Sequence, residues 1–422
     1  MVGAGPSGST AAYFLARAGL EVVLLERGPF PGSKNMGGAT LFGRPTNELF
    51  PGFWEEAPLE RVLVDVQYWI LTEDSAARFA TKSRQFVNPP FNRITIIRSK
   101  FDAWLANKAA GAGATLLTGH KADGLLFRGQ KAVGVRLAYP QDGDLYADVV
   151  ILADGSNSLL GSQAGVIPKI KAKDMSLYVK ETIALPAGAI EERFNVGPRE
   201  GVGIGLGGYN TAGLVGTSSL HTYTDSVGIN VGIIVDTLKR CGLNPNDLLD
   251  RIKAHPAMAP LIAGGPTVEY TAHLIPDGGY NAIPKLVHDG ILIVGDAAGL
   301  VNGTHGINLA MFSGKFAAEA VIEAKRKKDF SAASLSLYQK LLDQSFVLQD
   351  LRKYRNVPAF YSSHPYVFHL YSRKMVETAL EVASVYPIPL DQKRRLIWGK
   401  MKSMQPPVRI LKDAHDAWKV TW

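Results

Sequence analysis

The sequence predicts an α/β fold in which a parallel-sheet domain is interleaved with an antiparallel-sheet domain and followed by a helical C-terminal region. Three observations predict it. A glycine-rich turn opens the chain and leads through a helix into the short apolar strand 21–26. Two further apolar runs, 148–152 and 290–294, have the continuous hydrophobicity of buried parallel strands. Between these runs, many strands rich in Gly and Thr indicate a second, mostly antiparallel sheet.

The order of these patterns predicts how the chain divides. At 422 residues the chain exceeds the usual size of a single hydrophobic core. Beyond residue 331 it becomes helical, basic and aromatic. We therefore expect a discontinuous nucleotide-binding domain formed by 1–60, 95–160 and 285–330, a substrate-side domain formed by 61–94 and 161–284, and a helical C-terminal region, 331–422.

Helix signals refine this outline. We expect a first helix from Ser7 to Ala18, ended by Gly19, and an amphipathic helix from Arg98 to Ala110, capped by Ser99. A helix is also expected at 246–253, inside the second domain. The segment 29–45 is rich in Gly and lacks periodicity, so it is predicted to be a loop.

Composition and charge restrict the class of protein. The fractions of hydrophobic residues (46%) and charged residues (20%) are those of a globular protein. The net charge of +8 would suit nucleic acid, an anionic membrane or an acidic partner, but no nucleic-acid-binding motif is present. No run approaches the roughly 20 apolar residues that cross a bilayer. No signal peptide is visible, and only Met1 and Val2 precede the first glycine, so we expect the true start to lie upstream.

Cysteine usage excludes several kinds of site. Cys241 is the single cysteine, so the chain cannot form an internal disulfide, a cysteine-ligated zinc site or an iron–sulfur cluster. No metal site is predicted. A reducing compartment is favoured, and we expect a cytoplasmic protein that either is soluble or lies peripherally on the cytoplasmic face of the inner membrane.

The first motif points to a dinucleotide. Gly3-Ala4-Gly5-Pro6-Ser7-Gly8 matches G-x-G-x-x-G, in which the glycines allow a tight turn, close approach of a pyrophosphate and close packing of helix on strand. The phosphates of such a ligand lie against the amides at a helix N-terminus. Glu26 ends the next strand at about the spacing expected for a carboxylate that binds ribose hydroxyls. The acidic residue argues against a 2′-phosphate, so the pattern predicts a Rossmann-type site for a dinucleotide other than NADP.

Two later segments extend the site. Asp154 and Gly155 follow the buried strand 148–152, where the crevice at the carboxyl ends of parallel strands receives ligands. Taken alone, this segment could equally be an ordinary strand-to-turn exit. Gly295 and Asp296 follow the strand 290–294, and a glycine-rich loop then opens a helix that runs to Ala324. This makes a second helix N-terminus suited to anions or dipoles, as a bipartite cofactor requires.

Together, these segments resemble the glutathione-reductase-type FAD proteins, and within them the FixC-like relatives of electron-transfer-flavoprotein:quinone oxidoreductase. The resemblance runs from Gly3 to at least Asp350 and includes geranylgeranyl reductases among its more distant members. Its specific stretches are 31–38, 50–58, 98–105, 255–256, 269–280 and 295–302.

The resemblance implies FAD as cofactor and assigns roles by position. The glycine turn and its neighbours would bind the pyrophosphate, Glu26 the adenosine ribose, Arg98 the region of the phosphates and ribose, and Ala122 the adenine through its backbone. Asp296 would hold the ribityl chain, Gly37 and Gly38 would lie near the isoalloxazine ring, and amides at 306–308 would face the flavin pyrimidine. The full set of implied cofactor-binding residues is Gly3, Ala4, Gly5, Pro6, Ser7, Gly8, Glu26, Arg27, Gly37, Gly38, Arg98, Ala122, Asp154, Gly155, Ser158, Gly295, Asp296, Gly306, Ile307 and Asn308.

The resemblance also implies a function. A FixC-like redox subunit would take electrons from electron-transfer flavoprotein onto FAD and pass them to a membrane quinone, within a bifurcating FixABCX-type complex. The missing cysteines fit a chain that is paired with a separate ferredoxin-like iron–sulfur subunit. No acid–base residue is assigned; His305 is a candidate near the flavin, and the role of Cys241 is left open.

Other functions remain open at this point. A geranylgeranyl reductase would reduce isoprenoid double bonds on the same scaffold, but the stretch 278–285 lacks the aromatic pair usual in that group. A flavin hydroxylase that uses NADPH directly, and a non-catalytic flavin relay between protein partners, are further alternatives.

The C-terminal region bears on membrane contact. Between 353 and 402, aromatic side chains alternate with basic ones, a pattern typical of a surface helix at an anionic interface. A packed helical tail with a solvated basic face, or a docking site for an acidic partner subunit, would give the same pattern.

Overall fold

The computed structural model of the chain describes residues 1–35, 37–302, 306–402 and 405–421. Two compact units are formed by interleaved segments of the chain. Unit 1 comprises 1–60, 89–175 and 273–352, and unit 2 comprises 61–88, 176–272 and 353–422. The predicted helical region 331–422 is thus divided between the units after Arg352.

Unit 1 contains both helices and short strands. Its helices are α1 (Pro6–Arg17), α2 (Gly43–Leu49), α3 (Arg98–Gly111), α4 (Leu159–Gln163), α9 (Gly306–Lys327), α10 (Ala332–Leu335), α11 (Leu337–Gln344) and α12 (Phe346–Lys353). Its strands are β1 (Val23–Glu26), β2 (Gly38–Phe42), β5 (Arg93–Ile97), β6 (Thr115–Thr118), β7 (Ala122–Arg128), β8 (Lys131–Leu137), β9 (Gly143–Tyr146), β10 (Val150–Leu152), β16 (Val287–His288) and β17 (Ile291–Ile293).

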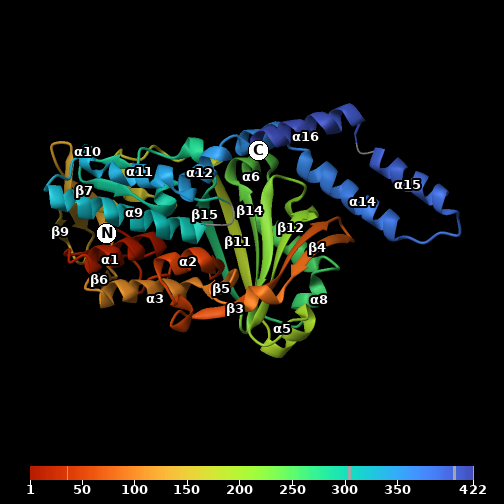
Figure 1. The fold of residues 1–422 in the computed structure, drawn as a ribbon, viewed down its shortest axis with the longest axis horizontal. Coiled ribbons are helices and arrows are strands. Elements are labelled where there is room, and N and C mark those ends of the chain that lie inside the picture. The colour runs from red at the N-terminus through yellow and green to blue at the C-terminus, as the bar shows by residue number, and fades with distance from the viewer. Residues whose placement is uncertain (36, 303–305, 403–404, 422) are drawn as a thin grey trace. The chain divides into compact units, whose positions relative to one another are not determined.

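A parallel sheet forms the centre of unit 1. β1 pairs in parallel with β6, and β10 pairs in parallel with β17. Val2 joins the two pairs, because it bridges in parallel to Leu25 on one side and to Leu152 on the other. Helices α1 and α9 pack against each other beside this sheet (Figure 1), and Gly314 of α9 lies so close to the backbone of Ser7 that a Cβ atom there would overlap it. The predicted Rossmann-type arrangement is confirmed.

Unit 2 is built on a second sheet. Its strands are β3 (Leu59–Leu71), β4 (Ala76–Lys82), β11 (Met175–Ala184), β12 (Glu200–Gly208), β13 (Gly216–Thr222), β14 (Ser226–Ile234) and the first part of β15 (Thr267–Pro276). Within it the order is β11-β14-β13-β12-β3, and every pair is antiparallel except β12 with β3. The predicted, mostly antiparallel second sheet is therefore confirmed.

Helices from the middle of the chain (α5–α8) cover one face of this sheet, and others form the C-terminal region. They are α5 (Ala187–Phe194), α6 (Val235–Cys241), α7 (Pro245–Ala254), α8 (Ala259–Ile262), α13 (Val357–Ser363), α14 (Ser372–Ala383), α15 (Leu390–Lys402) and α16 (Pro407–Thr421). Alternating residues of the strands, such as Val227, Ile229 and Val231 of β14, are fully buried in a core shared with Leu248 and Ile252 of α7.

Two local predictions were wrong. Ser99 does not cap α3: the helix begins at Arg98, after Ile97, and has no side-chain cap. The segment 29–45 is not wholly a loop, because β2 occupies Gly38–Phe42 and α2 begins at Gly43. β2 forms by pairing with β5, which lies more than 50 residues further along the chain, so no local sequence pattern predicts this strand.

Candidate flavin site

The glycine turn has the geometry that a bound pyrophosphate requires. Gly3 has a φ of +101°, and a Cβ atom there would overlap the carbonyl oxygen of Ala153. A Cβ atom at Gly8 would overlap the carbonyl oxygen of Gly3. At Gly5, by contrast, a Cβ atom would meet nothing within 4 Å. The first and third glycines therefore serve packing within the protein, and the second faces open space at the N-terminus of α1, where a phosphate would fit.

Glu26 is held directly beside this turn. Its Oε2 accepts a hydrogen bond from the amide of Ala4 (3.3 Å), and its Oε1 accepts one from the amide of Gly28 (2.7 Å). A carboxylate has about four lone-pair sites, so capacity remains for the hydroxyls of a ribose. The amide of His120 donates to the carbonyl oxygen of Glu26 (2.9 Å), and this brings the start of β7, where Ala122 lies, close to the same edge.

Asp154 and Ser158 bond to each other. The Ser158 hydroxyl donates to Oδ1 of Asp154 (3.2 Å), and the amide of Leu160 donates to Oδ2 (3.2 Å), so the carboxylate caps the N-terminus of α4. Burial raises the pKa of the Asp154 carboxyl, and these hydrogen bonds oppose the rise. Asp154 thus shapes the turn after β10, beside the glycine turn: a Cβ atom at Gly3 would lie 3.4 Å from its Cα.

Arg98 and Asp102 form a rigid pair on α3. The guanidinium donates to both carboxylate oxygens of Asp102 at 2.9 and 2.8 Å, and Asp102 is fully buried. Asn35 donates to the same carboxylate (2.6 Å). The amide of Arg98 donates to the carbonyl oxygen of Gly37 (2.8 Å), so the structure brings Gly37 and Gly38 beside Arg98.

Asp296 lies within the electrostatic reach of this pair. Desolvation raises the pKa of its carboxyl to about 6; the charge of Arg98 opposes the rise, and those of Asp277 and Asp102 add to it. The preceding residue, Gly295, contacts the first turn of α1, because a Cβ atom there would lie 2.7 Å from the Ser7 hydroxyl. The structure therefore joins the glycine turn and the Gly295–Asp296 segment into one site.

The N-terminus of α9 completes the arrangement. Gly306, Ile307 and Asn308 form its first turn. The side chain of Asn308 is 1% exposed; it donates to the carbonyl oxygen of Phe42 (3.2 Å) and accepts from the amide of the same residue (3.2 Å). It also donates to the Thr46 hydroxyl (3.0 Å). This side chain ties α9 to β2 and α2, which leaves the backbone of the first turn as the part that could face a ligand. Thr304 and His305, the candidate near the flavin, lie outside the described residues.

Sequence reasoning missed His273, Ser156 and Asp277. His273 Nε2 lies 3.4 Å from the hydroxyl of Ser156, which is 3% exposed. Burial and the charges of Arg98 and Arg27 lower the pKa of His273. His273 and Asp277 lie in the stretch 269–280, which contributes to the resemblance but carries no recognisable motif; Ser156 lies in the segment after the strand 148–152, but the sequence alone gave it no role of its own.

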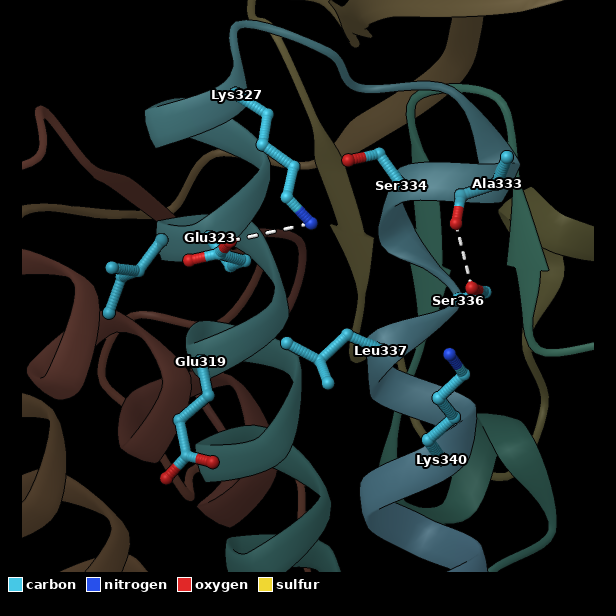
Figure 2. Close-up of a pocket in the computed structure, with 9 residues that line it drawn as sticks. Glu319, Glu323, Lys327, Ala333, Ser334, Ser336, Leu337 and Lys340 are labelled. Atoms are coloured by element: carbon cyan, nitrogen blue, oxygen red, sulfur yellow. Dashed lines mark hydrogen bonds and ion pairs between the residues drawn. The ribbon is translucent and has the colours of Figure 1, made fainter.

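A surface pocket of about 490 Å³ lies elsewhere in unit 1, between α9, α10 and α11 (Figure 2). Lys327 projects into it and pairs with Glu323 (3.4 Å), and Lys340 approaches from α11. None of the predicted cofactor residues lines it. Its mixed and mutually paired charges give it no preference for a dinucleotide.

Comparison with known proteins decides the family. Residues 1–41 match the model of the NAD(P)-binding Rossmann-like domain, and residues 357–422 match that of the ETF-QO/FixC family C-terminal domain. Protein FixC of Azotobacter vinelandii is 41% identical over 99% of this chain and 97% of its own length. The chain belongs to the ETF-QO/FixC family. The probable electron transfer flavoprotein-quinone oxidoreductase YdiS of Escherichia coli is 37% identical over 98% of this chain and 96% of its own length.

Membership in the ETF-QO/FixC family confirms the predicted resemblance. The protein is an FAD-dependent oxidoreductase that works in electron transfer. A solved structure of a geranylgeranyl bacteriochlorophyll reductase-like protein from Thermoplasma acidophilum aligns with a TM-score of 0.73 over 98% of this chain and 97% of its own, at 21% identity. That similarity confirms the fold.

Proposed function

We propose that this protein accepts electrons from reduced electron-transfer flavoprotein onto FAD and passes them to a membrane quinone, within a bifurcating FixABCX-type complex. The observation that carries the proposal is the full-length similarity to FixC proteins and to a probable electron transfer flavoprotein-quinone oxidoreductase. The single cysteine supports it further: because this chain cannot ligate an iron–sulfur cluster, that centre would belong to a separate ferredoxin-like subunit.

FAD, when bound, would supply two-electron chemistry, and the residues of unit 1 would position it. Gly5 and the N-terminus of α1 would receive the pyrophosphate, and Glu26 would accept from the ribose. Arg98, fixed by Asp102, would supply positive charge, and Asp296 would bond the ribityl hydroxyls. The first turn of α9 would present amides where negative charge gathers on reduction.

A flat face of the sheet in unit 2 suits the ring of a quinone. Glycines replace side chains along β12, so the ring of Tyr68 lies over Gly205 and Gly207, where Cβ atoms would come within 2.9 and 2.7 Å of it. A polar row crosses the neighbouring strands, where Asn230 donates to the hydroxyl of Ser219 (2.7 Å). A planar carbonyl compound could stack on the outer side of the Tyr68 ring, which is 48% exposed, with this polar row beside it.

We also propose contact with the cytoplasmic face of the inner membrane through the C-terminal helices. No helix among the described residues is both long and apolar enough to cross a bilayer. Large apolar side chains are nevertheless exposed on α15 and α16, including Leu396, Trp398 (58% exposed), Leu411 and Trp418. α15 also carries Lys393, Arg394, Arg395 and Lys400, so apolar and basic groups occur together, as at anionic interfaces.

Vesicle flotation tests this contact. The double substitution Leu396→Ser and Trp398→Ser should reduce binding to anionic vesicles severalfold, whereas Tyr146→Ser, at an exposed aromatic residue of β9 in unit 1, should leave it unchanged. Equal binding by all three proteins would exclude this surface.

The test of the redox proposal is anaerobic absorbance near 450 nm. Reduced electron-transfer flavoprotein should bleach the bound flavin, and a menaquinone analogue should restore the absorbance. Bleaching without recovery would favour the non-catalytic relay. If the partner and the quinone both fail, but a geranylgeranyl lipid reoxidises flavin that has been reduced with dithionite, the reductase alternative would replace the proposal.

A further inference from the structure

His273 lies at the edge of unit 1 where the predicted cofactor segments meet. It occupies β15, and its Nε2 is 3.4 Å from the Ser156 hydroxyl. Ser156 belongs to the turn that follows β10, two residues after Asp154, and this turn packs against Gly3 of the glycine turn. The imidazole is therefore placed among the segments that would hold a dinucleotide, although no family motif assigns it there.

The charges that act on His273 are mainly positive. Arg98 projects from α3, and Arg27 follows β1. Burial is the larger cause that lowers the pKa of the imidazole below its ordinary 6.5, and the two arginine charges lower it further, so the neutral form of His273 is favoured. Two carboxylates near this edge are engaged elsewhere: Asp154 caps α4, and Asp102 pairs with Arg98. Desolvation raises the pKa of the Asp296 carboxyl, and the charge of Asp277 adds to the rise.

We propose that His273 takes up a proton when the diphosphate of the cofactor binds, so that cofactor binding and protonation of this imidazole are linked. The two negative charges of the diphosphate would offset the field of Arg27 and Arg98, and the proton would come from solvent. No bond to the cofactor forms or breaks. The inference rests on the proposed binding of FAD at this site.

The direction in which FAD affinity changes with pH follows from the lowered pKa of His273. Without cofactor, the pKa of His273 lies below 6.5, and the diphosphate would raise it. Between the two values, binding takes up a proton, so the affinity for FAD should increase as pH falls through this window. The increase can reach about tenfold per pH unit and levels off below the lower value.

Calorimetry of FAD binding to the full-length apoprotein measures the proton directly. Titrations near pH 6.5 in two buffers of different ionisation enthalpy should report uptake of a fraction of a proton by the wild-type protein and none by the His273→Gln or His273→Asn variant. His288→Gln is the matched control. His288 is another histidine of unit 1 with a lowered pKa, but its Nε2 lies 3.1 Å from the carbonyl oxygen of Lys285, and it should keep the wild-type uptake.

The outcomes separate the two ideas. Absence of FAD binding by the wild-type protein would overturn the proposed cofactor site and the inference with it. Normal binding with the same proton uptake in the His273 variants would overturn the inference alone. A loss of affinity that is equal at pH 5.5 and pH 8.5 would show a purely structural role for His273, and it would also overturn the inference. Loss of affinity confined to the lower pH supports it.

Discussion

Gly5 and Gly8 occupy the same turn, yet replacing each with alanine should affect a different property: stability at Gly8 and FAD affinity at Gly5. At Gly8 a Cβ atom would overlap the carbonyl oxygen of Gly3 and lie 3.2 Å from the Cβ of Ala153, so α1 would have to move away from the sheet. Overpacking of this kind costs about 1–3 kcal/mol, and more where the obstacle is backbone. At Gly5 a Cβ atom meets nothing within 4 Å, and the φ of −76° suits alanine.

We therefore expect Gly8→Ala to lower the free energy of unfolding of the cofactor-free protein by about 3 kcal/mol, and Gly5→Ala to change it by less than about 0.5 kcal/mol. FAD affinity should fall at least tenfold in Gly5→Ala, because the methyl group would occupy the space proposed for the pyrophosphate. Denaturant unfolding without cofactor and fluorescence titration with FAD measure the two quantities separately. If Gly5→Ala binds FAD as the wild-type protein does, the pyrophosphate does not lie at this turn.

Three further substitutions test individual carboxylates. Asp296→Asn should stabilise the cofactor-free protein by about 1–3 kcal/mol at pH 7.5 but not at pH 4. The pKa of Asp296 is raised from 3.8 to about 6, so ionisation of its carboxyl destabilises the fold as pH rises through that window. A gain in melting temperature that is equal at both pH values would contradict this. Asp413→Asn should loosen α16, since its buried carboxylate accepts from the hydroxyls of Tyr366 (2.7 Å) and Tyr371 (2.6 Å). Burial would raise the pKa of Asp413, but these hydrogen bonds outweigh burial and lower it. The stabilisation is therefore present above the ordinary carboxyl pKa and is lost as pH falls through the pKa of the folded state. Asp413→Asn should speed hydrogen exchange across 405–421, and unchanged exchange would refute the prediction. Glu26→Gln should weaken FAD binding about tenfold without unfolding the protein, as measured by the same fluorescence titration, and unchanged affinity would exclude ribose binding at this position.

Local signals explain why much of the fold could be predicted. The glycine turn, the helix that follows it and the strand that ends at Glu26 are contiguous, so turn chemistry and hydrophobic periodicity suffice to place them. The helix expected at 246–253 is α7, which has Pro245 in its first turn and a side-chain cap from Asn244. The same reasoning holds for the apolar runs 148–152 and 290–294, which contain the parallel pair β10 and β17.

The remainder depends on contacts between distant segments. β2 and α2 carry Gly and Pro and lack periodicity; β2 forms by pairing with β5, and α2 is fixed through Thr46, which bonds Asn308 across 262 residues. His273 was missed because its significance lies in its position near Ser156 and two arginines, and none of these is near it in sequence. The roles of the individual cofactor residues stay predictions.

The hydrogen bonds of the Asn308 side chain affect when the entropy of ordering the site is lost. One amide group bonds both backbone groups of Phe42 and the hydroxyl of Thr46, so contacts within the protein itself join β2, α2 and the first turn of α9. The entropy of ordering these segments is lost during folding rather than when the ligand arrives. Segments organised by the protein itself suit a carrier that gives up its electrons and keeps its prosthetic group.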